Sequence, residues 1–154
     1  MKIIKFSELG NEKLLMRCAE TAGVADIVTD IIKDVAENGD GFISCVCDDW
    51  LPKVDFKAPK EPVYYDSTAG AIAACGFIEL SKATGDRKYL DSAMNILKAM
   101  YDKFCNWDND EQAILLMGTE RYDDDTGRHI SIIYGDYFFT EAIYKLKGND
   151  MLFW

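Results

Sequence analysis

The sequence predicts an all-α fold built from αα-hairpins that form part of a toroid. The first observation is the run AGAIAACGFIEL, residues 69–80, in which small apolar residues dominate. A helix that is apolar on all sides is a buried helix. The second observation is a weak repeat of a helix end, a Gly followed by Asn or Asp, and a new helix start, centred on Gly10, Gly85 and Gly148. No alternating apolar pattern with hairpin turns indicates a sheet.

Apolar residues recur at helical spacing in four stretches, which capping or breaking residues separate. The helices expected are 12–36, 67–84, 87–105 and about 135–147. The Asn-Gly-Asp-Gly stretch at 38–41 is expected to end the first helix, Asp66 or Ser67 to cap the second, and Gly85 to end it. All three prolines lie within 42–65, which therefore reads as an irregular connection. Most of 106–133 is expected to be loop as well.

The two helices of the 67–105 hairpin differ as the inner and outer helices of a toroid do. Small residues on the first helix let inner helices approach one another closely. One stripe of that helix consists of Ala69, Ile72, Ala73, Gly76, Phe77 and Leu80. The second helix has a charged face and is expected outside, with Tyr89, Leu97 and Tyr101 on its apolar face. The long loops then lie at the mouth of the central hole, and the chain supplies about two and a half hairpins.

Composition limits the classes of function. A chain of 154 residues is expected to form a single domain, residues 1–154. A net charge of −10 argues against nucleic acid and anionic membrane surfaces as partners. Five cysteines at scattered positions do not form a disulfide framework, so we expect a reducing, cytoplasmic compartment. No apolar run is long enough for a membrane span, and the N-terminal residues lack the apolar core of a signal peptide.

Four motifs, in the same order along the chain, resemble those of one enzyme family. DSTAGAIAACGFIELSK, residues 66–82, resembles the family segment D-S-S-A-A-A-I-A-A-C-G-L-L-E-L. IYGDYFFTEAIYKLKG, residues 133–148, is similar to the C-terminal I-Y-G-D-Y-Y-F-x-E-A-L. ILLMG at 114–118 resembles L-L-x-H-G, and VDFKAP at 54–59 resembles W-D-F-D-A-P. The first two motifs are specific, and the other two are weak alone. The family that they resemble is that of the unsaturated glucuronyl hydrolases, glycoside hydrolase family 88.

The resemblance implies an (α/α)6 barrel of which this chain is the C-terminal part. The family hydrates the C4=C5 bond of a Δ4,5-unsaturated uronic acid at the non-reducing end of oligosaccharides, with an aspartate as general acid and base. Its catalytic aspartates lie in the N-terminal half, so no residue here inherits a catalytic role, and the chain is expected to be inactive alone. No cofactor or metal is expected. Met117, Val54 and Tyr65 depart from the family, which has His, Trp and Arg there.

Five residues are candidate substrate contacts at the barrel mouth: Asp66, Ser67, Arg128, His129 and Tyr134. Asp66 and Ser67 begin an inner helix, where the alternative is a plain helix cap. Arginine can bind a uronate carboxylate through two hydrogen bonds, although a loop Arg and His are more often only solvated. Tyr134 can stack on a sugar ring, or it can be structural.

Other motifs have less to support them. Asp123 to Gly127 resembles part of a calcium loop but lacks the later bidentate Glu. The Cys45-Val46-Cys47 pair has no companion ligands, and Trp50 and Trp107 are expected to pack rather than bind sugar. The partners expected are an unsaturated uronic-acid oligosaccharide and either a second copy or a complementary chain. A non-catalytic helical module for self-association or protein interaction is the alternative function, because a partial toroid exposes apolar surface. An epimerase-like sugar isomerase is disfavoured, since the chain has one histidine.

Overall fold

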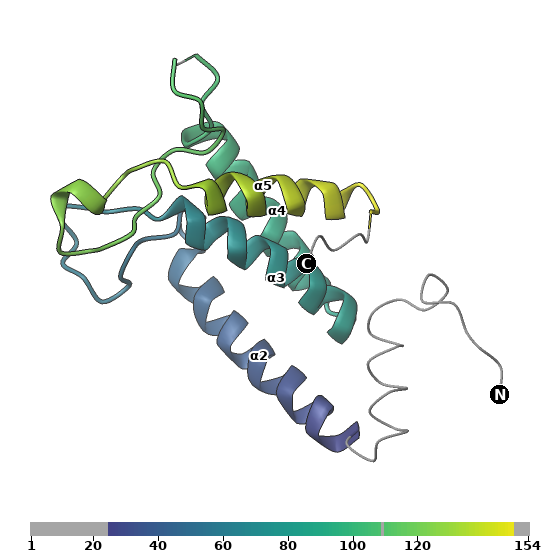
Figure 1. The fold of residues 1–154 in the computed structure, drawn as a ribbon. Coiled ribbons are helices and arrows are strands. Elements are labelled where there is room, and N and C mark those ends of the chain that lie inside the picture. Colours follow the sequence, from purple (N-terminus) through teal and green to yellow (C-terminus); the bar gives the residue numbers. More distant parts are fainter. Residues whose placement is uncertain (1–24, 109, 150–154) are drawn as a thin grey trace.

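The protein is all-α in a computed structural model that describes residues 25–108 and 110–149, with side chains from residue 30 onward. Four α-helices follow one another in the order shown in Figure 1: α2 (Ala25–Val46), α3 (Ser67–Thr84), α4 (Arg87–Lys103) and α5 (Ile133–Leu146), with a short 3-10 helix, η2 (Asp125–Gly127), before the last. The described residues contain isolated β-bridges and no strand. The predicted fold class is confirmed.

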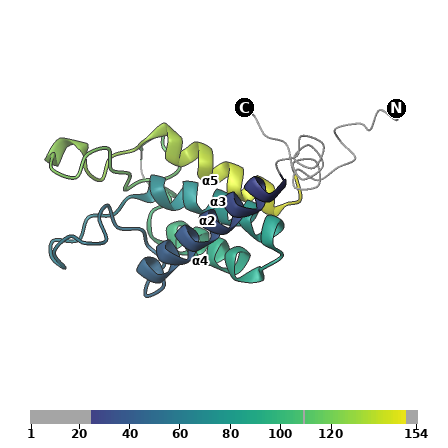
Figure 2. The ribbon, with the colours of Figure 1, turned by 90° about the horizontal axis from the view of Figure 1, so that it is seen from below.

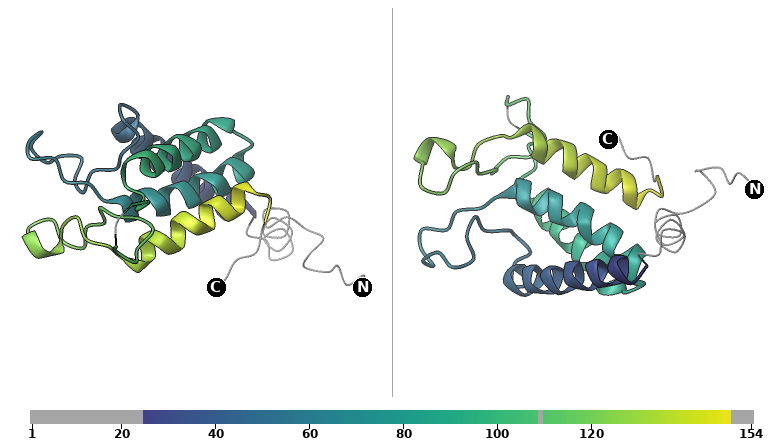
Figure 3. Two further views of the ribbon diagram at one scale, coloured as in Figure 1. Left: turned by 90° about the horizontal axis from the view of Figure 1, so that it is seen from above. Right: turned by 60° about the horizontal axis from the view of Figure 1, so that its bottom comes forward.

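Helix α3 is the centre of the molecule. It packs against α4 and α5 and, over a smaller area, against α2 (Figure 3). α4 runs back along α3 after the tight turn at Gly85, whereas α5 runs in the same direction as α3. The loops that precede α3 and α5 therefore extend from one end of the helices, as Figure 2 shows.

Local signals fix both ends of α3, at the bounds that the sequence predicts. The Asp66 carboxylate accepts a hydrogen bond from the Thr68 N–H at 3.1 Å, which satisfies a donor in the first turn. Gly85 adopts a left-handed conformation with φ of 71°, and its N–H donates to the Ser81 carbonyl at 2.9 Å. Glycine takes this conformation without steric cost.

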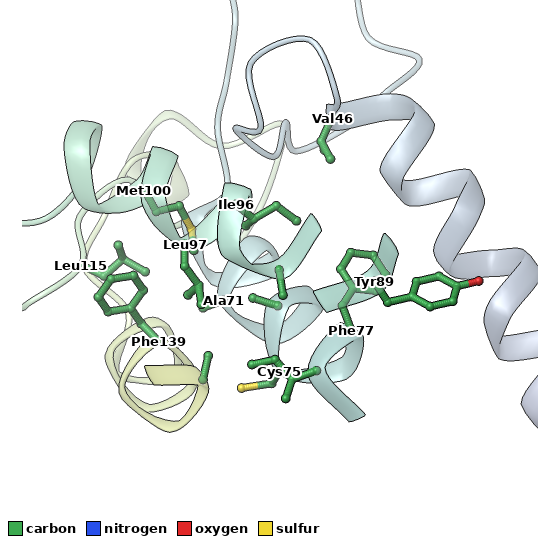
Figure 4. Packing of buried hydrophobic residues seen from close by; sticks show 14 of the residues in the cluster. Val46, Ala71, Cys75, Phe77, Tyr89, Ile96, Leu97, Met100, Leu115 and Phe139 are labelled. Carbon is green, nitrogen blue, oxygen red and sulfur yellow. The ribbon is translucent and has the colours of Figure 1, made fainter. Parts of the chain in front are cut away.

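Small residues on α3 allow the close packing that the sequence predicts. A Cβ added at Gly70 would lie 2.6 Å from Pro52 Cγ and 2.8 Å from Met100 Sδ. Ala71 and Ala74 have no exposed surface at all. Larger residues complete the core (Figure 4): Phe77 on α3 itself, and from the neighbouring elements Val46, Ile96, Leu97, Met100, Leu115 and Phe139. Helix α3 thus contributes mostly small side chains to this packing, and the neighbouring elements contribute mostly large ones.

Three residues expected inside are exposed. Ile72 is 45% exposed and Gly76 beside it is exposed too, so one stripe of α3 has no described element over it. Tyr101, expected on the apolar face of α4, is 52% exposed and packs instead on the Trp107 ring at 5.0 Å. Burial of α3 is therefore complete only on the faces toward α4 and α5.

Helix α2 continues through the stretch that was expected to end it. Gly39 lies within the helix and packs closely on α3, since a Cβ there would lie 3.1 Å from the Phe77 side chain and 3.2 Å from that of Leu80. The Asp40 carboxylate pairs with Lys88 Nζ at 2.9 Å. These contacts with α3 and α4 outweigh the low helix propensity of glycine. The prediction of a stop at 38–41 was wrong, and the predicted start at residue 12 lies outside the described residues.

A buried ion pair lies between α5 and α3. Glu141 and Lys145 are only 4% and 7% exposed, and Lys145 Nζ lies 2.8 Å from the Glu141 carboxylate and 3.2 Å from that of Glu79. Burial opposes the charge on Lys145, but the hydrogen bonds and charges of Glu141 and Glu79 together outweigh it and raise the pKa of the amine. Cys75 is buried close by, donates to the Phe138 carbonyl at 3.1 Å, and has its pKa raised to about 12 by burial.

Two glycines of α3 provide a matched test of this packing. Gly70→Ala should lower the free energy of unfolding by about 1–3 kcal/mol, because the rigid Pro52 ring must move. Gly76→Ala should raise it by about 0.5–1 kcal/mol, because nothing lies within 4 Å and alanine favours the helix. Urea unfolding followed by circular dichroism measures both changes. Equal effects from the two substitutions would contradict the close approach at Gly70.

Candidate functional site

The helices α3 and α5 begin side by side. A Cβ on Gly135, in the first turn of α5, would lie 3.3 Å from Thr68 Oγ1, and one on Gly118 would lie 3.0 Å from the same atom. Thr68 therefore lies between the start of α5 and the loop segment that crosses over it. The absence of a side chain at both glycines brings two helix N-termini and two loops to one end of the molecule (Figure 3).

Hydrogen bonds from distant segments hold the chain where it enters α3. The Tyr65 N–H donates to His129 Nε2 at 3.0 Å, and the Tyr65 carbonyl accepts from Thr119 Oγ1 at 2.7 Å. The Ser67 N–H donates to the Met117 carbonyl at 3.0 Å. Asp66 Oδ1 accepts from the Thr119 N–H at 3.3 Å as well as from its own helix. Both loops thus fix the start of α3.

His129 is oriented by its backbone and its neighbours. Its φ of 54° lies in the left-handed region, which non-glycine residues adopt infrequently. The imidazole lies beside the rings of Tyr64 and Tyr65, with centroids 5.7 and 6.3 Å away. Burial, and next the charge of Arg128, lower the pKa of His129 below its usual 6.5. Nε2 accepts a hydrogen bond, so the proton of the neutral ring is on Nδ1.

Arg128 is held by the loops on every side. Its guanidinium carbon lies 4.0 Å from the centre of the Tyr64 ring, in a cation–π contact. It donates to the Tyr122 carbonyl at 2.8 Å and forms an ion pair with Asp125. The side chain is only 15% exposed. Arg128 is therefore neither solvated nor free to bind the carboxylate of a ligand, because its hydrogen-bond donors already hold the loops together.

The remaining candidates differ sharply in accessibility. Ser67 is 1% exposed, so its side chain is buried at the helix start. Tyr134 is 64% exposed on the first turn of α5. Two residues along, the Asp136 carboxylate accepts from the N–H groups of Ile114 and Leu115, at 3.1 and 2.7 Å. Asp66, Ser67 and His129 thus lie around the segment that enters α3. Arg128 lies beside them, and Tyr134 lies on the adjoining helix.

Sequence reasoning missed Thr119 and Tyr64. Thr119 contacts both Tyr65 and Asp66 and is 8% exposed, yet it is one polar residue in a loop, 53 positions from Asp66. Tyr64 carries the Arg128 contact and also packs against Tyr122 at 5.9 Å. No local pattern marks either residue. The position of Thr119 directly after the ILLMG motif was the one available signal.

The acidic loop is used for structure. Asp124 accepts hydrogen bonds from the N–H and the hydroxyl of Thr126, at 2.9 and 2.7 Å, and so caps η2. Its neighbour Asp125 pairs with Arg128. Within residues 25–108 and 110–149, no three side chains of the metal-binding types lie close enough to hold an ion together. No helix in that part of the chain is long and apolar enough to cross a membrane.

The parallel pair α3 and α5, with α4 returning outside, defines the class: αα-hairpins that form part of an (α/α)6 barrel. The chain is similar to the unsaturated glucuronyl hydrolase of Bacillus sp. strain GL1, with 26% identity over 132 residues. That match covers 81% of this chain and 35% of the relative, so the chain spans about a third of the length of the protein it matches. The resemblance that the motifs predict is confirmed. No family model matches the chain.

Solved structures give the same result. The crystal structure of the Bacillus sp. GL1 enzyme, described as responsible for the degradation of glycosaminoglycan, has a TM-score of 0.66 at 28% identity. The match covers 77% of this chain and 33% of that enzyme. The unsaturated glucuronyl hydrolase of Streptococcus agalactiae has a TM-score of 0.61 at 23% identity, over 69% of this chain and 28% of its own, and supports the fold. These enzymes are (α/α)6 barrels, so the barrel prediction is confirmed.

The lowered pKa of His129 predicts that acid destabilises the fold. The neutral imidazole is favoured in the folded chain, so its contribution is present above pH 6.5 and is lost as the pH falls from 6.5 toward the folded pKa. Stability should therefore decrease more steeply below pH 6.5 in the parent than in His129→Gln, whose amide can accept from Tyr65 without titrating. Urea unfolding between pH 7.5 and 5 measures this difference. Parallel curves would show that His129 titrates as it does in the unfolded chain.

Proposed function

We propose that this chain, residues 1–154 as one domain, acts as the C-terminal portion of an unsaturated glucuronyl hydrolase-like barrel. The observation that supports this most is the match of its helices to the Bacillus sp. GL1 enzyme, at a TM-score of 0.66. The substrate class follows from the relatives: one structure of such an enzyme is a complex with dGlcA-Glc-Rha-Glc, and another, from Streptococcus agalactiae, with dGlcA-GalNAc6S. The ligand proposed is an oligosaccharide that ends in an unsaturated uronic acid.

The substrate contacts proposed are at the end where α3 and α5 begin. Tyr134 is exposed and offers a ring on which a sugar can stack. His129 has an Nδ1–H to donate, and Asp66 has a second carboxylate oxygen to accept from sugar hydroxyls. Ser67 supports Asp66 from its buried position at the helix start. Arg128 would bind a uronate carboxylate only by exchanging it for Asp125.

Chemistry by the chain alone is not expected. The family's catalytic aspartates have no counterpart here, and the carboxylates at the helix starts are engaged. Asp66 accepts from Thr68 and Thr119, and Asp136 accepts from Ile114 and Leu115. Both carboxylates therefore serve to hold backbone N–H groups at the helix starts. The chain therefore contributes binding surface, and proton transfer must come from the rest of a barrel.

A partner is expected to cover the open faces. Ile72 on α3 and Ile133 on α5 are 45% and 74% exposed, and both belong to helices that would be inner helices of a barrel. About two thirds of the chain of each relative lies outside the match. Either a complementary chain or a second copy can supply helices for these faces. Cys45 and Cys47 are exposed free thiols, which favours a reducing compartment such as the cytoplasm.

One observation favours the alternative, a helical module for protein interaction. Ile31 and Val35 lie one turn apart on α2 and are 54% and 51% exposed. Paired apolar residues on a free helix face are a common means of helix association. Self-association through α2 requires neither a sugar nor a completed barrel.

Hydrolysis and binding assays separate the two functions. The purified chain should leave the ultraviolet absorbance of an unsaturated uronyl disaccharide unchanged, and co-expression with the N-terminal portion of the Bacillus relative should produce its loss. In that complex Tyr134→Ala should weaken sugar binding about tenfold, the loss of one stacking contact. The matched control is Tyr101→Ala, which removes another ring that is more than half exposed, from the outer helix.

Two results would contradict the proposed function. Turnover by the chain alone would contradict the proposed inactivity. Absence of both turnover and sugar binding in the co-expressed complex, together with self-association that Ile31→Asp abolishes, would favour the interaction module.

A further inference from the structure

Side chains, rather than a neighbouring strand, satisfy both polar groups of the Tyr65 backbone. Thr119 Oγ1 donates to the Tyr65 carbonyl at 2.7 Å, and His129 Nε2 accepts from the Tyr65 N–H at 3.0 Å. The two residues are themselves connected, because the backbone N–H of His129 donates to Thr119 Oγ1 at 3.4 Å. This closed set of three hydrogen bonds, the Tyr65 clamp, fixes the residue that directly precedes Asp66.

Thr119 is the common member of these contacts. Besides its hydroxyl bonds to Tyr65 and His129, its N–H donates to Asp66 Oδ1 at 3.3 Å. The residue is 8% exposed. Gly118, next to it, exchanges two hydrogen bonds with Ile130, of 2.9 and 2.8 Å, so the backbone that carries Thr119 is paired and cannot swing away freely.

The Tyr65 clamp leaves one polar atom available on each of the two residues that flank it, Asp66 and His129. Asp66 Oδ2 and His129 Nδ1 have no hydrogen-bond partner among the described residues, whereas Asp66 Oδ1 and His129 Nε2 are both occupied. One of the available atoms accepts and the other donates. Such a pair suits the hydroxyl groups of a sugar, which do both.

We propose that Thr119 is the positioning residue of this site: its hydroxyl holds the Tyr65 backbone so that the Asp66 carboxylate and the His129 imidazole present these two atoms to a sugar. The sugar rests on the function proposed above, but the Tyr65 clamp does not. Thr119 acts through Tyr65 and touches no substrate. The charged and titratable groups around His129 are Arg128, which is paired with Asp125, the rings of Tyr64 and Tyr65, and Asp66 through Thr119.

The test compares Thr119→Val, which keeps the shape and loses the hydroxyl, with Thr119→Ser, which keeps the hydroxyl. His129 is the one histidine of the chain, so its imidazole resonances can be followed by NMR without overlap. In Thr119→Val the midpoint of the His129 titration should rise toward 6.5. The Tyr65 amide should exchange with solvent at least about tenfold faster, which corresponds to the loss of one net hydrogen bond. Thr119→Ser should keep the parent values.

Three results would overturn the proposal. The first is a His129 titration in Thr119→Val that matches that of the parent, because Thr119 would then have no influence on His129. The second is the same change in Thr119→Ser as in Thr119→Val, because the hydroxyl would then not be the cause. The third needs no variant and applies if Thr119→Val fails to fold: a Thr119 hydroxyl proton that exchanges with water as fast as an exposed one.

Sugar binding is measured separately. Titration of an unsaturated uronyl disaccharide into the complex with the N-terminal portion should show about tenfold weaker affinity for Thr119→Val than for the parent or Thr119→Ser. If the complex of the parent chain binds no sugar, the proposed function fails, while the His129 titration still decides the role of Thr119. If the sugar binds equally to all three, Thr119 does not position the site.

Discussion

The close approach of other elements to helix α3 is the constraint on which the rest of the structure depends. Gly70 admits Pro52 and Met100 to distances that no Cβ would allow. Ala71 and Ala74 have no exposed surface, so the neighbouring helices press against them. Small residues on one helix and large ones on its neighbours give dense packing at short separation. α4 and α5 can both lie against α3 only because the side chains of α3 are small on these faces.

This packing determines what the loop end of the molecule can do. With α3 and α5 parallel, their N-termini lie together, and Gly118 and Gly135 bring the crossing loop onto Thr68. Thr119 and His129 then reach the Tyr65 backbone and hold Asp66 in place. The result is an end rich in oriented donors and acceptors but with its cation, Arg128, already paired. In the function proposed above, such an end contributes contacts to a polar ligand, and the rest of a barrel contributes the catalytic groups.

Some of this could be predicted from the sequence, where the signals are local. Asp66, the apolar run and Gly85 define α3 to the residue, because a cap and a left-handed stop act within one helix turn. The two specific motifs also identified the kind of relative. Gly39 misled, because its partners Phe77 and Leu80 lie on another helix. The Tyr65 clamp could not be predicted, since it joins residues 54 and 64 positions apart, and the Asp125 pairing of Arg128 depends on a loop geometry that no spacing encodes.

Native-state hydrogen exchange measures most directly whether α3 organises the fold. We predict that the amides of the middle of α3, around Ala74, exchange only on global unfolding and are the slowest in the molecule. The first turns of α2, which carry the exposed Ile31 and Val35, should exchange through local opening at lower free energy. Amides of α3 that exchange as readily as those of α2, while α4 or α5 stays protected, would contradict the central role of α3.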